Sequence, residues 1–125
     1  MYINLKDYCS IEKIKILTLN IVNTYNPSLP FPARFDCVKG YWRINIARAK
    51  KYEYIVGLDK DRILCIFRLK DWYNANTLIN AVLPPCPDPN RKEFDGVLVG
   101  PNEKIYTDLI GKRIINPRSP IGYYG

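Results

Sequence analysis

The segment from residue 52 to residue 73 constrains the fold of this chain more than any other stretch. Two runs rich in β-branched and aromatic residues, YEYIVGL and RILCIFRLKDWY, flank the polar triplet DKD at 59–61. This pattern predicts a β-hairpin with the triplet at its turn. In the second run, apolar residues occupy both alternating sets of positions between 63 and 67. A strand of this kind is buried on both faces, so we expect it near the centre of a sheet.

Periodicity, capping residues and turn signals predict shorter elements along the rest of the chain. The first half begins with an amphipathic helix (11–25) that has Ser10 as its N-cap, followed by an irregular proline-containing connection (27–39). A short strand then opens at Gly40, and one or two helical turns follow Asn45 (46–52). After the hairpin we expect a short helix (74–83), a strand (93–100), a helix capped by Asn102 and stopped at Gly111, and a basic tail (112–125). Ile14, Ile16 and Leu19 interrupt the first helical pattern and also fit a strand.

The length of 125 residues predicts a single domain, with a core built on the strand, helical turn and hairpin at 40–73. A hydrophobic content of 47% is sufficient for a packed interior without disulfides or metals. The mixed order of short helices and strands indicates an α+β fold. We expect a small, curved antiparallel sheet with short flanking helices.

The cysteine content and hydropathy of the chain bear on its cellular setting. The chain has four cysteines but no CxxC pair and no histidine, so the spacing typical of a zinc site is absent. The opening MYINLKDYCS is too polar for the apolar core of a signal peptide, and no apolar run is long enough to span a membrane. We therefore expect reduced thiols and a cytoplasmic protein without a membrane partner.

Basic residues concentrate in one region of the chain. Between 34 and 51 there are six basic residues and one acidic residue, a net +5 out of +7 for the whole chain. The basic residues are Arg34, Lys39, Arg43, Arg48, Lys50 and Lys51, and they interleave with the aromatic residues Tyr41, Trp42, Tyr52 and Tyr54. Cations for phosphates and flat rings for unpaired bases are what a nucleic-acid-binding surface requires.

Strand alternation divides this region into two faces. It places Tyr41 and Arg43 on one face and Trp42 and Ile44 on the other. We therefore expect Tyr41 and Arg43 to be exposed. In the alternative interpretation Trp42 and Tyr54 belong to the core, and the cations after residue 45 only solvate a helix.

Three further cations, Lys112, Arg113 and Arg118, follow the helix stop at Gly111. They either complete a phosphate-binding surface or lie favourably at the negative end of the preceding helix. The sequence leaves these two interpretations open.

Candidate catalytic residues are few. The absence of histidine removes the commonest general base. Asp95, Glu103 and Lys104 loosely match the carboxylates and lysine of a magnesium-dependent nuclease, although Glu103 and Lys104 are adjacent and fall in a predicted helix. We keep the nuclease as an alternative. We assign no catalytic residue, metal ligand or cofactor.

The stretch GYWRINIARAKKYEYIVGLDKDRILCIFRLKDWY, taken with LIGKRI and the later Asn–Pro pair, resembles the PUA/ASCH/EVE group of small β-barrels. The resemblance covers roughly residues 40–73 and 109–117 and implies a PUA-like partial barrel that binds RNA or a modified base. It also implies a ligand surface formed by Tyr41, Trp42, Arg43 and the basic helix, with Lys112 and Arg113.

The preferred prediction is thus a non-enzymatic protein that binds RNA or DNA through Tyr41, Trp42, Arg43, Arg48, Lys50, Lys51, Lys112 and Arg113. Besides the nuclease, a second alternative to nucleic-acid binding is that the chain is a structural or interaction protein. In that case the C-terminal SPIGYYG, anchored by exposed Tyr123 and Tyr124, docks on a partner or on a second copy of the chain. Abundant isoleucine, lysine, tyrosine and asparagine are typical of an AT-rich genome such as that of a virus, mobile element or thermophile.

Overall fold

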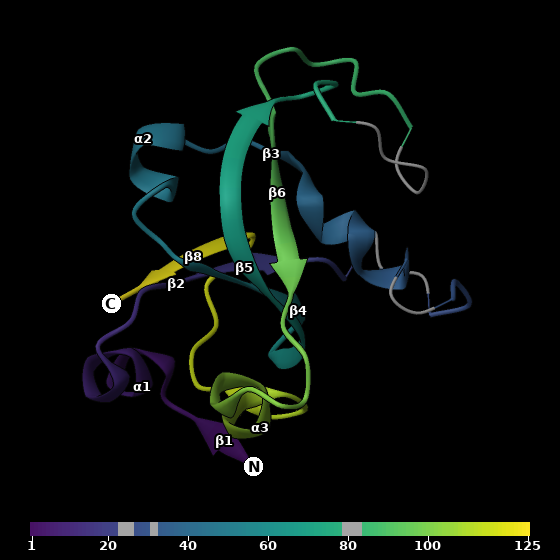
Figure 1. Cartoon of the computed structure of the whole chain (residues 1–125). Coiled ribbons are helices and arrows are strands. Elements are labelled where there is room, and N and C mark those ends of the chain that lie inside the picture. The colour runs from purple at the N-terminus through teal and green to yellow at the C-terminus, as the bar shows by residue number, and fades with distance from the viewer. Residues whose placement is uncertain (23–26, 31–32, 79–83) are drawn as a thin grey trace.

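A computed structural model describes residues 1–22, 27–30, 33–78 and 84–125 of the chain (Figure 1). In these residues, eight strands form one open sheet that is flanked by short helices, an α+β arrangement. The strands are β1 (Tyr2–Ile3), β2 (Ile16–Asn20), β3 (Gly40–Trp42), β4 (Tyr54–Asp59), β5 (Arg62–Asn74), β6 (Lys92–Leu98), β7 (Arg113–Ile114) and β8 (Ile121–Tyr124). The helices are α1 (Leu5–Glu12), α2 (Ile46–Ala49), α3 (Lys104–Leu109) and the 3-10 helix η1 (Ala33–Lys39).

The predicted hairpin is confirmed as β4 and β5. The two strands pair antiparallel from Tyr54 opposite Arg68 to Asp59 opposite Arg62, with a bulge after Gly57. Strand β5 also pairs with β6 and, at its first residue, with β7, so it lies at the centre of the sheet as expected. The order along the main path is β1-β7-β5-β4-β2-β8, and β6 joins β3 to β5.

The sheet is mixed, so the expectation of an antiparallel sheet is correct for most strand pairs but wrong for two of them. Strand β2 runs parallel to β4, with Ile16 opposite Tyr54 and Leu19 opposite Gly57, and β1 runs parallel to β7. Two parallel strands must be joined by a crossover. Here the crossover from β2 to β4 contains η1, β3 and α2, which places β3 and α2 near one end of the molecule (Figure 1).

The predicted helix at 11–25 is wrong over most of its described length. Helix α1 starts earlier, because the Asn4 side chain accepts a hydrogen bond from the Asp7 amide at 3.1 Å, and it ends at Lys13 in a left-handed conformation. The following Ile16–Asn20 form strand β2, as the alternative interpretation of this stretch predicted. Both faces of β2 are buried, and residues apolar on both faces also match a helical spacing over so short a run.

The other predictions differ in outcome. The strand near 93–100, the helical turn after Asn45 and the helix near 102–110 are confirmed as β6, α2 and α3. Of the helix expected at 74–83, residue 74 ends β5 and residues 75–78 form a turn, while residues 79–83 lie outside the described residues. The basic tail at 112–125 is part of the sheet, because it supplies β7 and β8.

Two apolar cores lie on the two faces of the sheet. Alternate residues of β2 contribute to opposite cores, with Ile16 on the side of α1 and α3 and Leu17 on the side of η1 and α2. Among the described residues, no helix combines the length and apolar character needed to cross a membrane.

Candidate functional site

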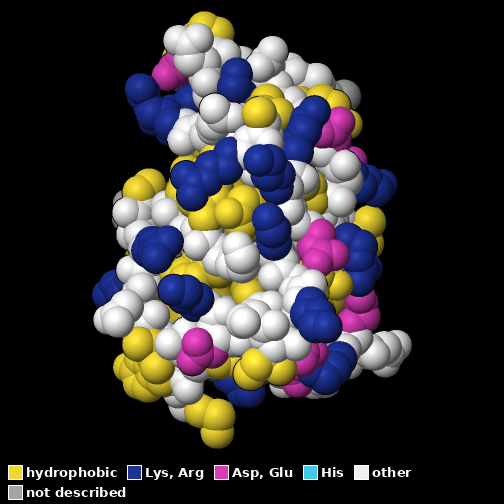
Figure 2. Space-filling view, turned by 90° about the vertical axis from the view of Figure 1, so that its left-hand side faces the viewer, with side chains coloured by type: hydrophobic (Ala, Val, Ile, Leu, Met, Phe, Trp, Pro, Cys, Tyr) yellow, Lys and Arg dark blue, Asp and Glu magenta, His cyan; other side chains and the backbone are white. Residues whose placement is uncertain are grey.

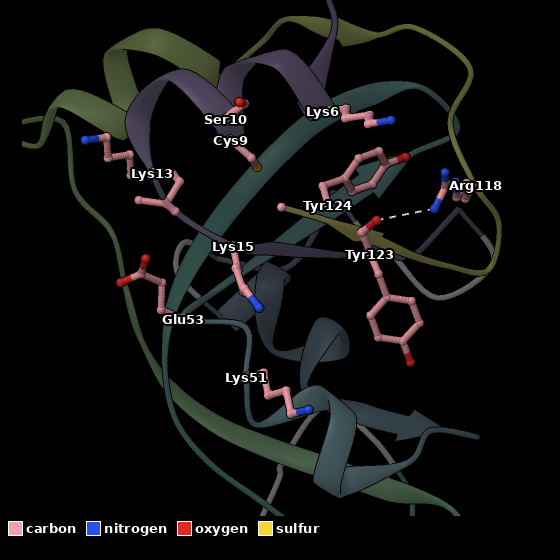
Figure 3. Close-up of a pocket in the computed structure, with 12 residues that line it drawn as sticks. Lys6, Cys9, Ser10, Lys13, Lys15, Lys51, Glu53, Arg118, Tyr123 and Tyr124 are labelled. Carbon is pink, nitrogen blue, oxygen red and sulfur yellow. Dashed lines mark hydrogen bonds between the residues drawn. The ribbon is translucent and has the colours of Figure 1, made fainter.

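A pocket of about 720 Å³ lies between α1, the connection from α1 to β2, the segment that follows α2, and β8 (Figure 3). Its described lining contains five cationic side chains and a single acidic side chain, that of Glu53. The cations are Lys6, Lys13, Lys15, Lys51 and Arg118. We call this cavity the basic pocket. Its charge favours an anionic occupant.

The walls of the basic pocket are partly apolar and aromatic. Cys9, Ile14, Tyr123 and Tyr124 line it between the cations. Cys9 is only 1% exposed, and burial raises the pKa of its thiol to about 11. The thiol is therefore neutral at physiological pH, so Cys9 serves as wall rather than as nucleophile.

Helix α2 carries a second feature to the edge of this pocket. The helix starts where the Asn45 side chain accepts a hydrogen bond from the Arg48 amide at 3.1 Å. The guanidinium carbon of Arg48 then lies 3.6 Å from the centroid of the Tyr123 ring, and the Tyr52 ring packs against Tyr123 at 5.2 Å. Arg48 and Tyr123 together form a flat, cationic platform, and Arg48 is itself exposed.

Cations gather on the face of the molecule that carries these elements. Figure 2 shows this face, which is the left-hand side of Figure 1 with α1, α2 and β8. Lysine and arginine side chains are spread down its middle around hydrophobic patches, whereas acidic side chains lie mainly along one side and near the lower end. The basic pocket therefore belongs to a broader positively charged face.

A second pocket, of about 310 Å³, adjoins β3 and the start of β8. Tyr41, Trp42 and Arg43 line it together with Arg91, so the structure brings this part of the predicted site together. The Arg43 side chain is 75% exposed and pairs with Asp88 at 3.2 Å.

The two rings of this second pocket have partners within the chain. The Trp42 indole donates to the Val38 carbonyl at 2.8 Å and packs against the core, as the alternative interpretation predicted. The Tyr41 hydroxyl donates to the Pro84 carbonyl at 2.9 Å, and burial is the main cause that raises its pKa. Neither ring is thus a freely exposed stacking surface.

The remaining predicted residues do not converge on one hollow. Lys51 lines the basic pocket, but Lys50 pairs with Asp71 at 3.5 Å and lines neither of the two pockets. Arg113 pairs with Asp61 at 2.5 Å on β7, which β5, β4 and β2 separate from β8. Lys112 precedes it there. The expectation that Lys112 and Arg113 complete the same surface is therefore not met.

Sequence reasoning missed most of the basic pocket. Lys6 precedes the helix predicted at 11–25, whereas Lys13 and Lys15 fall within it, so the predicted elements do not bring these three lysines together. A signal for Lys13 and Lys15 is that this pair of cations directly precedes a strand whose first four residues are buried, whereas no sequence signal points to Lys6. Their convergence with Lys51 depends on the parallel pairing of β2 with β4.

The residues of the nuclease alternative are engaged elsewhere. The Asp95 carboxylate accepts a hydrogen bond from the adjacent Gly96 amide. Glu103 pairs with Arg68, whereas Lys104 pairs with Glu12 at 2.5 Å and Asp108 at 2.7 Å. Within the described part of the chain, no cluster of three or more potential metal ligands occurs.

The C-terminal tyrosines are also not free anchors. Strand β8 pairs antiparallel with β2, which puts Tyr124 opposite Ile16 and leaves it only 7% exposed. Tyr123 lies under Arg48. The expectation of two exposed tyrosines for docking is therefore wrong, because these side chains pack on the chain's own sheet.

Comparison with known proteins identifies no relative. No protein-family model, curated protein or solved structure matches the chain. The assignment of a function therefore depends on the geometry and charge of the pockets.

Proposed function

We propose that this chain binds nucleic acid, RNA or DNA, through the basic pocket and without catalysing a reaction on it. One observation supports the proposal above all others. Five cationic side chains and one acidic side chain surround a pocket of about 720 Å³ whose wall includes two tyrosines. Cations bind the phosphates of a nucleic-acid backbone and release condensed counterions.

The size and lining of the pocket fit part of a nucleic-acid chain. Ligand pockets commonly measure ~300–1,000 Å³, and the basic pocket falls within this range. The Arg48–Tyr123 platform at its edge offers a flat surface on which an unpaired base can stack. Charge and stacking together support a nucleic acid over a small inorganic anion.

A binding role also fits the reactive groups that line the pocket. The chain contains no histidine, and the Cys9 thiol is neutral. Glu53 is the one acidic side chain among the described lining residues, whereas a metal-dependent nuclease needs several acidic side chains in a cluster.

The fold and setting of the protein form part of the same proposal. A PUA-like relationship is kept as part of the proposal: the short helices beside one sheet are compatible with it, whereas the described sheet is open and not closed into a barrel. A cytoplasmic setting is supported by the four cysteines, all of which are buried and none of which is in a disulfide in the described structure. Fold alone does not fix function, so the binding test is decisive.

The test is fluorescence anisotropy with labelled single-stranded RNA, single-stranded DNA and duplex DNA at increasing salt. We expect tight binding at low salt that weakens steeply as salt increases. The double variant Lys15→Gln/Lys51→Gln should lower the affinity at least tenfold, on the estimate that each charged contact contributes about 1.5–3 kcal/mol.

The matched control is Lys60→Gln. Lys60 lies at the tip of the β4–β5 hairpin, at the opposite end of β4 from Glu53 of the basic pocket. Lys60→Gln removes one positive charge, as each of the two substitutions at Lys15 and Lys51 does. Its affinity should equal that of the wild type. If no nucleic acid binds at low salt, or if Lys60→Gln weakens binding as much as the double variant Lys15→Gln/Lys51→Gln does, the proposal fails.

A further inference from the structure

We infer that the bound nucleic acid is a single strand, and that Arg43 and Arg91 form a second phosphate subsite for it beyond the basic pocket. In the free chain the Asp88 carboxylate occupies this subsite. The inference rests on the proposed function and extends it to the kind of ligand and the length of the site.

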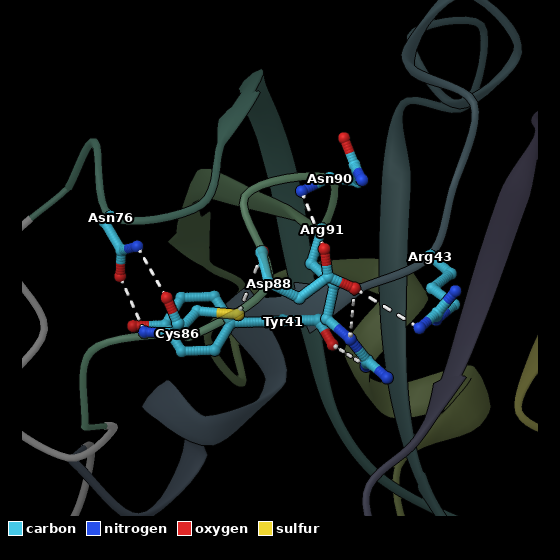
Figure 4. Close-up of polar contacts among 7 residues, drawn as sticks. All are labelled: Tyr41, Arg43, Asn76, Cys86, Asp88, Asn90 and Arg91. Carbon is cyan, nitrogen blue, oxygen red and sulfur yellow. Dashed lines mark hydrogen bonds and ion pairs between the residues drawn. The ribbon is translucent and has the colours of Figure 1, made fainter.

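The first step is the position of two arginines in the second pocket (Figure 4). Arg43 directly follows β3 and Arg91 directly precedes β6, and both lie against the same oxygen, Asp88 Oδ2. The distances are 3.2 Å from Arg43 Nη2 and 3.8 Å from Arg91 Nε. Arg91 is held in place because it also donates to the Tyr41 carbonyl at 3.1 Å.

The second step is the chemistry of that arrangement. Two guanidinium groups that converge on one carboxylate oxygen present the geometry that also binds a phosphate. The Arg43–Asp88 pair is weak because the arginine side chain is 75% exposed and screened by solvent. A phosphodiester of a bound strand can therefore displace Asp88 without the loss of a buried ion pair.

The third step is the path between the pockets. Ile121 lines the second pocket, while Tyr123 and Tyr124 line the basic pocket, so β8 connects the two. The segment from Tyr41 to Lys51 runs beside β8: Arg43 shares a pocket with Ile121, Arg48 lies over Tyr123, and Lys51 lines the basic pocket.

The length of this path suits a short stretch of one strand. The three steps from Ile121 to Tyr124 span about 10 Å at ~3.3 Å per residue. A strand within a duplex advances ~3.4 Å per nucleotide, and an unpaired strand is more extended, so at most about three nucleotides span the path between the pockets. The exposed Arg48 platform in the middle of the path requires an unpaired base, which a duplex does not offer.

The test measures the affinity of oligothymidylates from about 2 to about 16 nucleotides, the upper limit being the largest site of common single-strand-binding folds. Wild-type affinity should increase with length once an oligonucleotide reaches both pockets. Arg43→Gln should lower the affinity for long oligonucleotides roughly threefold to tenfold and leave the affinity for the shortest oligonucleotides unchanged. Arg62→Gln, at the start of β5 and remote from β8, is the matched control.

A gain-of-affinity variant supplies the complementary test. Asp88→Asn frees both arginines from the carboxylate but keeps Oδ1 as acceptor for the Asn90 amide, now 2.9 Å away. It should raise the affinity for long oligonucleotides roughly threefold to tenfold and leave short ones unchanged. Circular dichroism and thermal melting establish that each variant is folded.

The outcomes separate this inference from the proposed function. If short oligonucleotides bind through the basic pocket but longer ones bind no better, the second subsite is wrong and the proposed function stands. The same conclusion follows if Asp88→Asn lowers the affinity for long oligonucleotides in a folded protein. If duplex binds as tightly as single strand, the assignment to a single strand is wrong. If nothing binds, both fail.

Discussion

The guanidinium carbon of Arg48 lies 3.6 Å from the centroid of the Tyr123 ring, although 75 positions of sequence separate the two residues. The contact joins α2 to the last strand of the sheet at the edge of the basic pocket. The contact holds the planar guanidinium of Arg48 between the basic pocket and the second pocket. Several consequences of this arrangement can be measured.

Arg48→Lys keeps the positive charge but removes the planar face. If a base stacks on the guanidinium, the affinity for single-stranded oligonucleotides should decrease about fivefold to tenfold, the lower part of the range for one base stack. The salt dependence should not change, because the charge is retained. Anisotropy at several salt concentrations measures both quantities. Equal affinity for both proteins would show that Arg48 contributes only its charge.

Lys6→Gln tests the wall of the basic pocket that α1 provides. For a single strand, the slope of log affinity against log salt changes by ~0.7 for each phosphate contact. We therefore expect the slope to become shallower by about this amount in Lys6→Gln, with Lys60→Gln as the unchanged control. A slope identical to that of the wild type means that Lys6 lines the pocket without touching the ligand.

Gly122→Ala tests how β8 is seated. A Cβ atom at Gly122 would lie 2.5 Å from Thr18 Oγ1 and 2.8 Å from Tyr124 Cε2. Both neighbours are buried, so the strand or the tyrosine must shift, and overpacking of this kind costs about 1–3 kcal/mol of unfolding free energy. Urea denaturation measures the cost. Gly100→Ala is the control, because its Cβ would meet no described atom within 4 Å.

Asp108→Asn tests the polar contact between α1 and α3. The Lys104 ammonium, at 2.7 Å, and the Tyr8 hydroxyl, at 2.8 Å, lower the pKa of the Asp108 carboxyl. A carboxyl whose pKa is lower in the folded than in the unfolded chain stabilises the fold above an unfolded pKa of ~3.9. That stabilisation is lost as the pH falls through the folded pKa.

Thermal melting between about pH 3 and pH 7 measures this effect. Asp108→Asn should melt at a lower temperature than the wild type at neutral pH, and the difference should shrink at the acidic end. The substitution Asp7→Asn, on the exposed surface of α1, controls for the loss of a carboxylate. A constant difference across the pH range would contradict the assignment.

Local patterns were sufficient to predict several elements. The hairpin of β4 and β5 follows from two β-rich runs around a polar turn, and α2 follows from the capping side chain of Asn45. The buried centre of β5 follows from apolar residues at both alternating sets of positions. These features depend on residues close together in sequence, so they can be read from it directly.

Segments that are apolar on both faces could not be assigned in this way. Ile16–Asn20 matches a helical spacing as well as a strand, and its parallel pairing with β4 decides between them. The same pairing brings Lys15 beside the end of the segment that carries Lys51. The parallel partner strand is separated in sequence by the entire crossover connection, so no local pattern predicts the pairing.

The sequence by itself determined the excess of positive charge, the absence of histidine, the central hairpin and the exposed position of Arg43. Only the tertiary structure decided which cations share a pocket, that Trp42 packs inward, and that Tyr123 lies beneath Arg48. The reason is physical. Composition and short-range periodicity depend on neighbouring residues, whereas a binding surface depends on the long-range pairing of strands, and here the position of β8 against β2 sets that surface.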